Sequence, residues 1–143
     1  MPYEYSEESA TADIAFTAWG ETVEETFLAA ADATLNVMVE ELGAIQPKER
    51  RDLRVENCQL DLLLLDFLQE LIYYKDAETL MLRIKEVKIL EDGKKFILQA
   101  AAWGEKLDPE RHPQRVDVKA VTLHQFRLEK TNHGWEAFVI LDI

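Results

Sequence analysis

Two tight turns in the second half of the chain constrain its fold more than any other feature. Asp92-Gly93 separates two segments that read as strands, and this dipeptide tolerates the positive φ angles of a two-residue hairpin turn. Residues 132–134, Asn-His-Gly, separate the alternating segment 116–128 from the apolar segment 135–143. Strands that are joined by short turns run antiparallel. The second half of the chain therefore predicts antiparallel sheet.

The first half shows helical periodicity in two places. Thr22 and Glu25 form a capping box, in which a hydroxyl and a carboxylate bind free backbone N–H groups, and apolar residues then recur at helical spacing up to Gly43. A broad apolar face from about Leu60 to Tyr74 predicts the second helix. With an alternating strand over 12–18, the order is strand, helix, strand, helix, then strands. We therefore predict one α+β domain over residues 1–143, with a mostly antiparallel sheet and two packed helices.

The balance of charges excludes one class of function. The chain has 28 acidic and 16 basic residues and a formal net charge of −12, and its basic residues are scattered. Tight binding to nucleic acid needs clustered Lys and Arg to neutralise phosphates, so we do not expect this chain alone to bind RNA tightly. A basic protein partner or a bound cation suits such a field better. The alternative is that the acidity only provides solubility.

Nothing in the sequence predicts a membrane span or secretion. No run of about 18 apolar residues occurs, and the acidic N-terminal segment lacks the charge and apolar pattern of a signal peptide. The single cysteine, Cys58, cannot form an internal disulfide, which suits a reducing compartment. We expect a cytoplasmic protein without contact to a membrane.

Catalytic motifs are scarce. The sequence has no Gly-rich phosphate loop, no GxSxG, no HExxH and no CxxC, and its 3 histidines are spread out. Cys58 has no basic group near it in sequence, which predicts a packed or exposed thiol rather than a nucleophile.

The last residues suggest a cation site. If the apolar run before Asp142 places it in the sheet, its side chain and the α-carboxylate of Ile143 form a pair of anionic oxygen donors. Asp13 adds a third carboxylate, because it interrupts an apolar strand. Like charges held together repel each other unless a cation offsets them, and oxygen-only donors suit Ca²⁺, Mg²⁺ or Mn²⁺ rather than zinc. The alternative is that Asp13 is a cap or edge residue and Asp142 is solvated.

Several segments, in order and with suitable spacing over essentially the whole chain, together resemble the archease family. The combination is specific, above all the Asp-Ile end with Lys-Ala-Val-Thr upstream. The matching segments are Thr11-Ala12-Asp13-Ile14, residues 66–76, residues 104–112, residues 117–124 and Asp142-Ile143.

The resemblance implies a function and a set of residues. Archeases are α+β proteins that help RtcB-type RNA ligases to join RNA ends in tRNA splicing and RNA repair, by promoting guanylylation and multiple turnover of the ligase. It implies an activator rather than an enzyme, with RNA contacted only through the ligase. The family's metal ligands fall on Asp13, Asp142 and Ile143, with Ca²⁺ favoured and Mg²⁺ or Mn²⁺ as alternatives. The family's functional lysine falls on Lys119, and we expect Asp117 and His124 to contribute to the same partner surface.

The sequence departs from the family pattern beside the expected metal site. Ala10 stands where the family usually has His, which removes an imidazole and puts metal affinity in doubt. Ala15 replaces a usual Gly and only fills a little space on a strand.

A three-residue turn at 132–134 would also fix the positions of His124 and Lys119 relative to Asp142. If residues 132–134 form the loop, Thr131 pairs with Trp135, and His124 then lies opposite Asp142 near the metal. A one-residue change of register puts Gln125 there instead. Lys119 would lie roughly 16 Å further along, at about 3.3 Å per residue, and would contact the partner rather than neighbour the metal. The alternative is an exposed strand lysine that protects a sheet edge.

Two other functions stay open at this point. One is a general protein-binding module or chaperone without a metal role. The other is a small metal-dependent hydrolase that uses the same carboxylates, with His124 as its only general base near the cluster.

Overall fold

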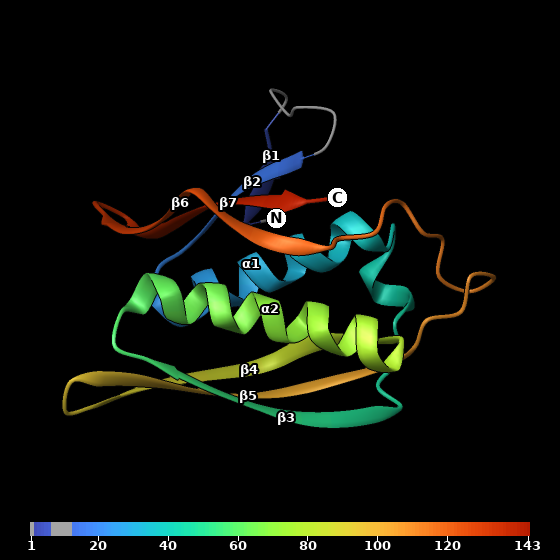
Figure 1. The fold of residues 1–143 in the computed structure, drawn as a ribbon, viewed down its shortest axis with the longest axis horizontal. Helices are drawn as coiled ribbons and strands as arrows, with labels where there is room; N and C mark the ends of the chain where they lie inside the picture. Colours follow the sequence, from blue (N-terminus) through green and yellow to red (C-terminus); the bar gives the residue numbers. More distant parts are fainter. Residues whose placement is uncertain (1, 7–12) are drawn as a thin grey trace.

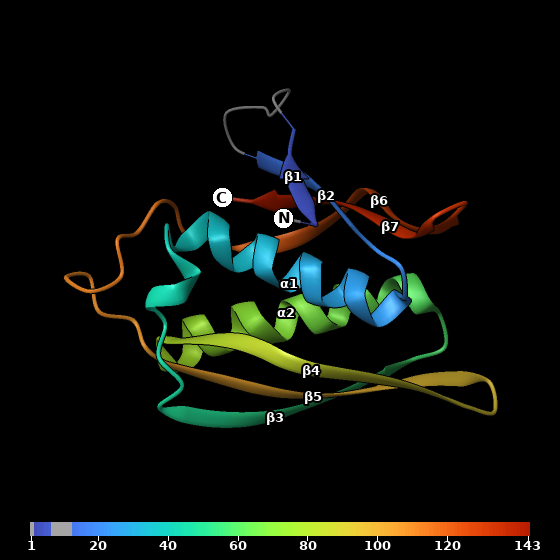
Figure 2. The same ribbon diagram turned by 180° about the vertical axis from the view of Figure 1, so that it is seen from behind.

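The computed structural model describes residues 2–6 and 13–143, and in this part of the chain two α-helices form a layer between two antiparallel β-sheets (Figure 1). Figure 2 shows the same three layers from behind. The elements are β1 (Tyr3–Tyr5), β2 (Asp13–Gly20), α1 (Val23–Met38), the short 3-10 helix η1 (Leu42–Ala44), β3 (Glu49–Asn57), α2 (Leu60–Glu78), β4 (Leu80–Asp92), β5 (Lys95–Lys106), β6 (Ala120–Thr131) and β7 (Gly134–Asp142).

The strands divide into a four-stranded sheet in the order β1-β2-β7-β6 and a three-stranded sheet in the order β3-β5-β4. Helix α1 packs on β2 and β4, and α2 packs on β3, β4 and β6, so each helix contacts both sheets. The predicted α+β architecture with antiparallel strands and two packed helices is confirmed. The sequence did not indicate that the strands separate into two sheets.

Both predicted helices are present, but each ends at a different residue from the one predicted. Thr22 caps α1 by accepting the backbone N–H of Glu25 at 3.1 Å, whereas the Glu25 carboxylate accepts the N–H of Glu21 at 2.9 Å. Helix α1 ends at Met38, before Gly43, because Val39 turns extended and forms a bridge with Gln114.

Helix α2 continues beyond the predicted Tyr74 to Glu78. Thr79 then adopts a left-handed conformation with φ 55°, and its N–H bonds the carbonyl of Tyr74.

The core lies on both faces of the helical layer. Phe27 of α1 and Phe67 of α2 stack with ring centroids 6.0 Å apart, and both are fully buried. Phe16 closes the core from the four-stranded sheet and Leu98 from the three-stranded sheet, each with no exposed surface. Neither helix, nor any other in the described part of the chain, is long and apolar enough to cross a membrane.

The hairpin predicted at Asp92-Gly93 is confirmed. Asp92 pairs with Lys95, and Gly93 has the positive φ angle of 65° that the turn requires. The alternating segment expected over 116–128 begins its strand later, because β6 starts at Ala120 rather than at Val116, and a loop therefore connects β5 to β6 up to Lys119.

Candidate functional site

The end of β7 lies directly beside the start of β2. Asp13 and Asp142 are cross-strand partners, followed by Ile14 with Leu141. Because side chains alternate along a strand, burial of Leu141 toward the helices turns Asp142 to the opposite face. Direct partners point to the same face, so Asp13 lies there too. The prediction that the last residues are held beside Asp13 is confirmed.

Asp13 and Asp142 are half-buried residues. Asp13 and Asp142 take part in none of the ion pairs found among residues 2–6 and 13–143. Ile143 follows β7 with its side chain packed against the core, which holds the final residue close to Asp142. Oxygen donors of this kind fit a hard divalent cation.

The expected metal site differs from a cluster of side chains. Within the part of the chain that the structure describes, no three His, Cys, Asp or Glu side chains are arranged to hold a metal ion. The expected site instead combines two aspartates with the carboxylate at Ile143. The donors fit in type, and Ala10 lies outside the described residues.

Lys119 lies at the same end of the sheet. Its backbone N–H donates to the carbonyl of Asp142 at 2.8 Å, and the next residue, Ala120, is the cross-strand partner of Asp142. The prediction that Lys119 lies roughly 16 Å along the strand from the metal site, and is not its neighbour, is therefore wrong. Its side chain is exposed, so it remains able to contact a partner.

The error came from the register of β6 against β7. Thr131 pairs with Gly134 rather than with Trp135, so the loop is one residue shorter than predicted. The register then shifts between Thr122 and Arg127, where Gln125 has a positive φ of 54°. As a result, Ala120 rather than His124 lies opposite Asp142.

His124 is exposed within the irregular part of β6, outside the regular pairing with β7. Its predicted position beside the metal site is wrong, and its role as a partner contact stays a prediction.

Asp117 is bound to a buried lysine that the sequence analysis missed. Lys75 of α2 is only 8% exposed, and its ammonium donates to Asp117 at 2.6 Å, to the carbonyl of Val118 at 2.8 Å and to Asp76. Burial lowers the pKa of Lys75, but the hydrogen bonds with Asp117 and Asp76 outweigh that effect and leave the pKa raised. Lys75 therefore stays protonated. Its place four residues after Leu71, on the buried face of the helix, was the available signal.

A second missed cluster anchors the loop after β5. Glu105 is buried and accepts two hydrogen bonds from Arg111, at 2.7 and 3.0 Å, and one from the N–H of Gln46 at 2.6 Å. His112, fully buried, accepts the N–H of Asp108 at Nδ1, so its Nε2 carries the proton that faces Glu105 at 3.1 Å. The Arg111 hydrogen bonds outweigh burial, and together with Gln46 and His112 they lower the pKa of Glu105 to about 2.

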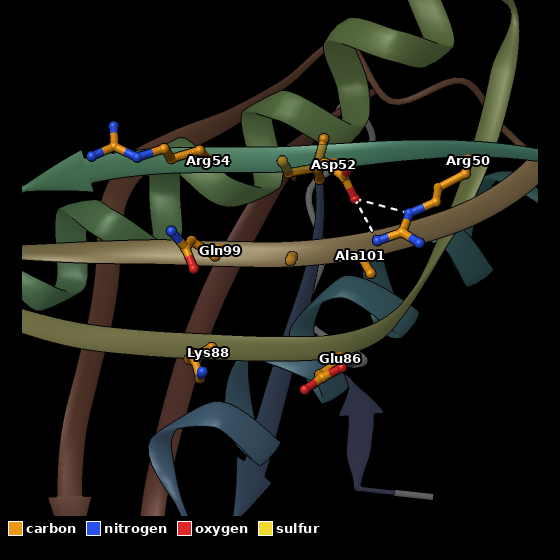
Figure 3. A pocket seen from close by; sticks show the side chains of 9 residues that line it. Arg50, Asp52, Arg54, Glu86, Lys88, Gln99 and Ala101 are labelled. Carbon is orange, nitrogen blue, oxygen red and sulfur yellow. Dashed lines mark hydrogen bonds and ion pairs between the residues drawn. The ribbon is translucent and has the colours of Figure 1, made fainter.

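The outer face of the three-stranded sheet is hollowed but carries no comparable site. Figure 3 shows this hollow, with a volume of about 420 Å³, lined by side chains of β3, β4 and β5. Arg50 donates there to Asp52 at 3.0 Å, and Arg54 pairs with Glu56 at 3.0 Å. Such exposed pairs on a sheet surface contribute little and predict no chemistry.

The comparison with protein families decides what kind of protein carries this site. A model described as "Archease protein family (MTH1598/TM1083)" matches residues 3–143. The chain belongs to the archease family. Two archeases illustrate the similarity: "Protein archease" of Pyrococcus abyssi is 42% identical over 134 residues, covering 93% of this chain and 94% of that protein. The archease of Methanosarcina mazei is 41% identical over 142 residues, covering 99% and 95%.

Solved structures of the family share the fold. The solution structure of Methanobacterium thermoautotrophicum protein 1598 is 34% identical and superposes with a TM-score of 0.85, covering 99% of each chain. The crystal structure of a Thermotoga maritima archease, described as a possible chaperone, has a TM-score of 0.59 and covers 96% of each chain. At 17% identity, the Thermotoga protein bears on the fold alone.

Proposed function

We propose that this chain is a metal-binding accessory protein that activates an RtcB-type RNA ligase in tRNA splicing or RNA repair, by promoting guanylylation and turnover of the ligase. The observation that carries the proposal is the direct pairing of Asp13 with Asp142. It brings together, on one face of the sheet and next to Ile143, two carboxylates that form no ion pair with any basic residue in the described part of the chain.

We propose Ca²⁺ as the bound ion, with Mg²⁺ or Mn²⁺ as alternatives. Asp13, Asp142 and the carboxylate at Ile143 would hold the ion through oxygen atoms alone, which hard cations prefer. When bound, the ion supplies positive charge that offsets the repulsion between the carboxylates. Pairing between β2 and β7 brings the two aspartates together before an ion binds. The entropic cost of ordering these ligands on binding is therefore smaller.

Lys119 extends this site toward a partner. Its N–H bond to Asp142 fixes its backbone beside the carboxylates, while its side chain is exposed. We propose that this end of the sheet contacts the ligase, and that RNA is contacted only through the ligase. An activator can shift an equilibrium only if it binds one state of its target better, so the chain must prefer one state of the ligase.

Ligase turnover with and without the purified chain tests the proposal. We expect wild type to increase guanylylation and the number of RNA ends joined per ligase. Asp13→Asn and Asp142→Asn keep the shape of the side chains but remove charge, and each should abolish Ca²⁺ binding in calorimetry together with the stimulation. Asp52→Asn is the matched control, because Asp52 is an exposed aspartate on the other sheet whose partner is Arg50.

The role of the last residue has its own test. One glycine added after Ile143 converts its carboxylate into a peptide bond, and should weaken Ca²⁺ binding without changing thermal stability. Stimulation that survives in both aspartate variants would remove the metal from the mechanism. Binding to unrelated proteins without ligase stimulation would instead favour a general chaperone.

A further inference from the structure

Lys75 is a buried cation on the otherwise apolar inner face of α2. Its neighbours on the inner face of α2, such as Leu68, Leu71 and Ile72, are buried hydrophobic residues. Taking an ammonium out of water is costly unless hydrogen bonds and charges compensate it. An apolar side chain would fill this position at lower cost, so the lysine needs a reason other than packing.

Two of the three acceptors of Lys75 lie in the segment that leads to Lys119. The ammonium binds the side chain of Asp117 at 2.6 Å and the buried carbonyl of Val118 at 2.8 Å. The third acceptor, Asp76, is its neighbour on α2. Lys75 thus joins the helix layer to residues that precede β6.

The next residue is held from the opposite side. The N–H of Lys119 donates to the carbonyl of Asp142 in β7 at 2.8 Å. Residues 117–119 belong to no strand, so sheet pairing does not define their path. Successive residues are instead held by α2 at 117 and 118, and by β7 at 119. By holding the two preceding residues, Lys75 helps to fix the position of Lys119 beside the two aspartates.

We infer that Lys75 is a positioning residue for the candidate site, which holds Asp117 and Val118 so that Lys119 is presented beside Asp142. This inference rests on the proposed function for its consequence, because it assigns Lys119 to the ligase contact. Its structural part is independent of any ligase.

Amide hydrogen exchange of the free protein tests the structural part. In Lys75→Met, the methionine retains the packing of the aliphatic stem but removes both bonds to the loop. We expect the amide of Lys119 to exchange at least about tenfold faster, because two charge-assisted hydrogen bonds no longer hold the segment, while amides in the middle of α2 keep their protection. Unchanged exchange at Lys119 would overturn the inference.

A second variant and a matched control separate this effect from loss of folding. Asp117→Asn changes an exposed side chain, 66% of which is accessible, and should also accelerate exchange at Lys119, to a smaller extent. Lys106→Met is the control, because Lys106 also donates to a backbone carbonyl, that of Glu78 at 3.1 Å, but is exposed and binds no residue of the 117–119 segment. It should leave exchange at Lys119 unchanged.

Ligase stimulation tests the functional part through a double variant. Lys75→Met should raise the concentration of the chain needed for half-maximal stimulation about fivefold or more, as expected for a coupling between sites. If Lys75 acts through Lys119, Lys75→Met added to Lys119→Met causes no further loss. Losses that multiply in the double variant would overturn the positioning role. Absence of stimulation by wild type would refute the proposed function, and hydrogen exchange would still decide whether Lys75 holds the segment.

Discussion

Replacing Glu105 by alanine tests how strongly one buried carboxylate holds the loop between β5 and β6. Glu105 accepts hydrogen bonds from Arg111, His112 and the backbone N–H of Gln46, so three parts of the chain meet at one side chain. The loop anchored there continues to Lys119. Loss of the carboxylate should therefore lower the stability of the whole protein and also loosen the loop that leads to the candidate site.

The loss of unfolding free energy in Glu105→Ala depends on which hydrogen-bond partners of Glu105 can bind water instead. His112 is fully buried, so its Nε2–H loses the one acceptor that residues 2–6 and 13–143 provide, at a cost of about 1–3 kcal/mol. The N–H of Gln46 is at an exposed residue and can bind water, which limits that loss to about 0.5–1.5 kcal/mol. The Arg111 side chain is 39% exposed and regains solvent. We expect Glu105→Ala to lower the free energy of unfolding by about 2–4 kcal/mol in total.

Urea denaturation, followed by tryptophan fluorescence and circular dichroism, measures this change. A loss of about 2–4 kcal/mol corresponds to a melting temperature about 7–13 °C lower for a domain of this size. Glu56→Ala is the matched control, since Glu56 also pairs with basic side chains, Arg54 and Lys95, but on an exposed face. Its denaturation midpoint should stay close to that of wild type. Equal midpoints for the Glu105 and Glu56 variants would refute the reasoning.

Three further predictions use the same measurement of stability. The pKa of Glu105 in the folded protein, about 2, lies below its ordinary value of 4.5, so its stabilising effect is complete above the ordinary value and is lost as pH falls toward 2. Glu105→Gln should make the decline of stability over this range shallower, and an identical pH profile would contradict this. Gly104→Ala should lower the free energy of unfolding by more than about 3 kcal/mol, because a Cβ would lie 1.7 Å from the carbonyl oxygen of Met81. Gly43→Ala, with no atom within 4 Å of the new Cβ, should change stability by less than about 0.5 kcal/mol. Thr79→Gly should stabilise the protein by about 1 kcal/mol, because Thr79 adopts a φ of 55°, and a lower midpoint would show that its side chain contributes more than the strain costs.

Local sequence patterns predicted the elements well because their causes are local. The capping box at Thr22 and Glu25 and the turn at Gly93 depend on residues a few positions apart, and both are present. The end of α2 was missed because the apolar pattern stops at about Tyr74, although the helix continues to Glu78 and Lys75 is buried. The three-residue strand β1 is too short to show a period.

Arrangements between distant segments were harder to predict. Alternation shows that a segment is a strand but not which strand lies beside it, so the division into two sheets stayed hidden. The turn between β6 and β7 is one residue shorter than predicted, and the register shifts again near Gln125, which has a positive φ. Ala120 rather than His124 therefore lies opposite Asp142. The pairing of Asp13 with Asp142 was expected from the charges and from the family resemblance, whereas Lys75 and Glu105 emerge only when α2 and β5 are placed against the loop.

The central place of β7 has a consequence for how the molecule folds. β2 lies between β1 and β7, so this early strand cannot complete its pairing until β7, a segment far along the sequence, has joined the sheet. Contacts with such long separation form late and slowly, and they leave β2 exposed to misassembly in the meantime. Because Asp13, Lys119 and Asp142 meet only through this last closure, the ability to capture a cation would serve as a readout of complete folding.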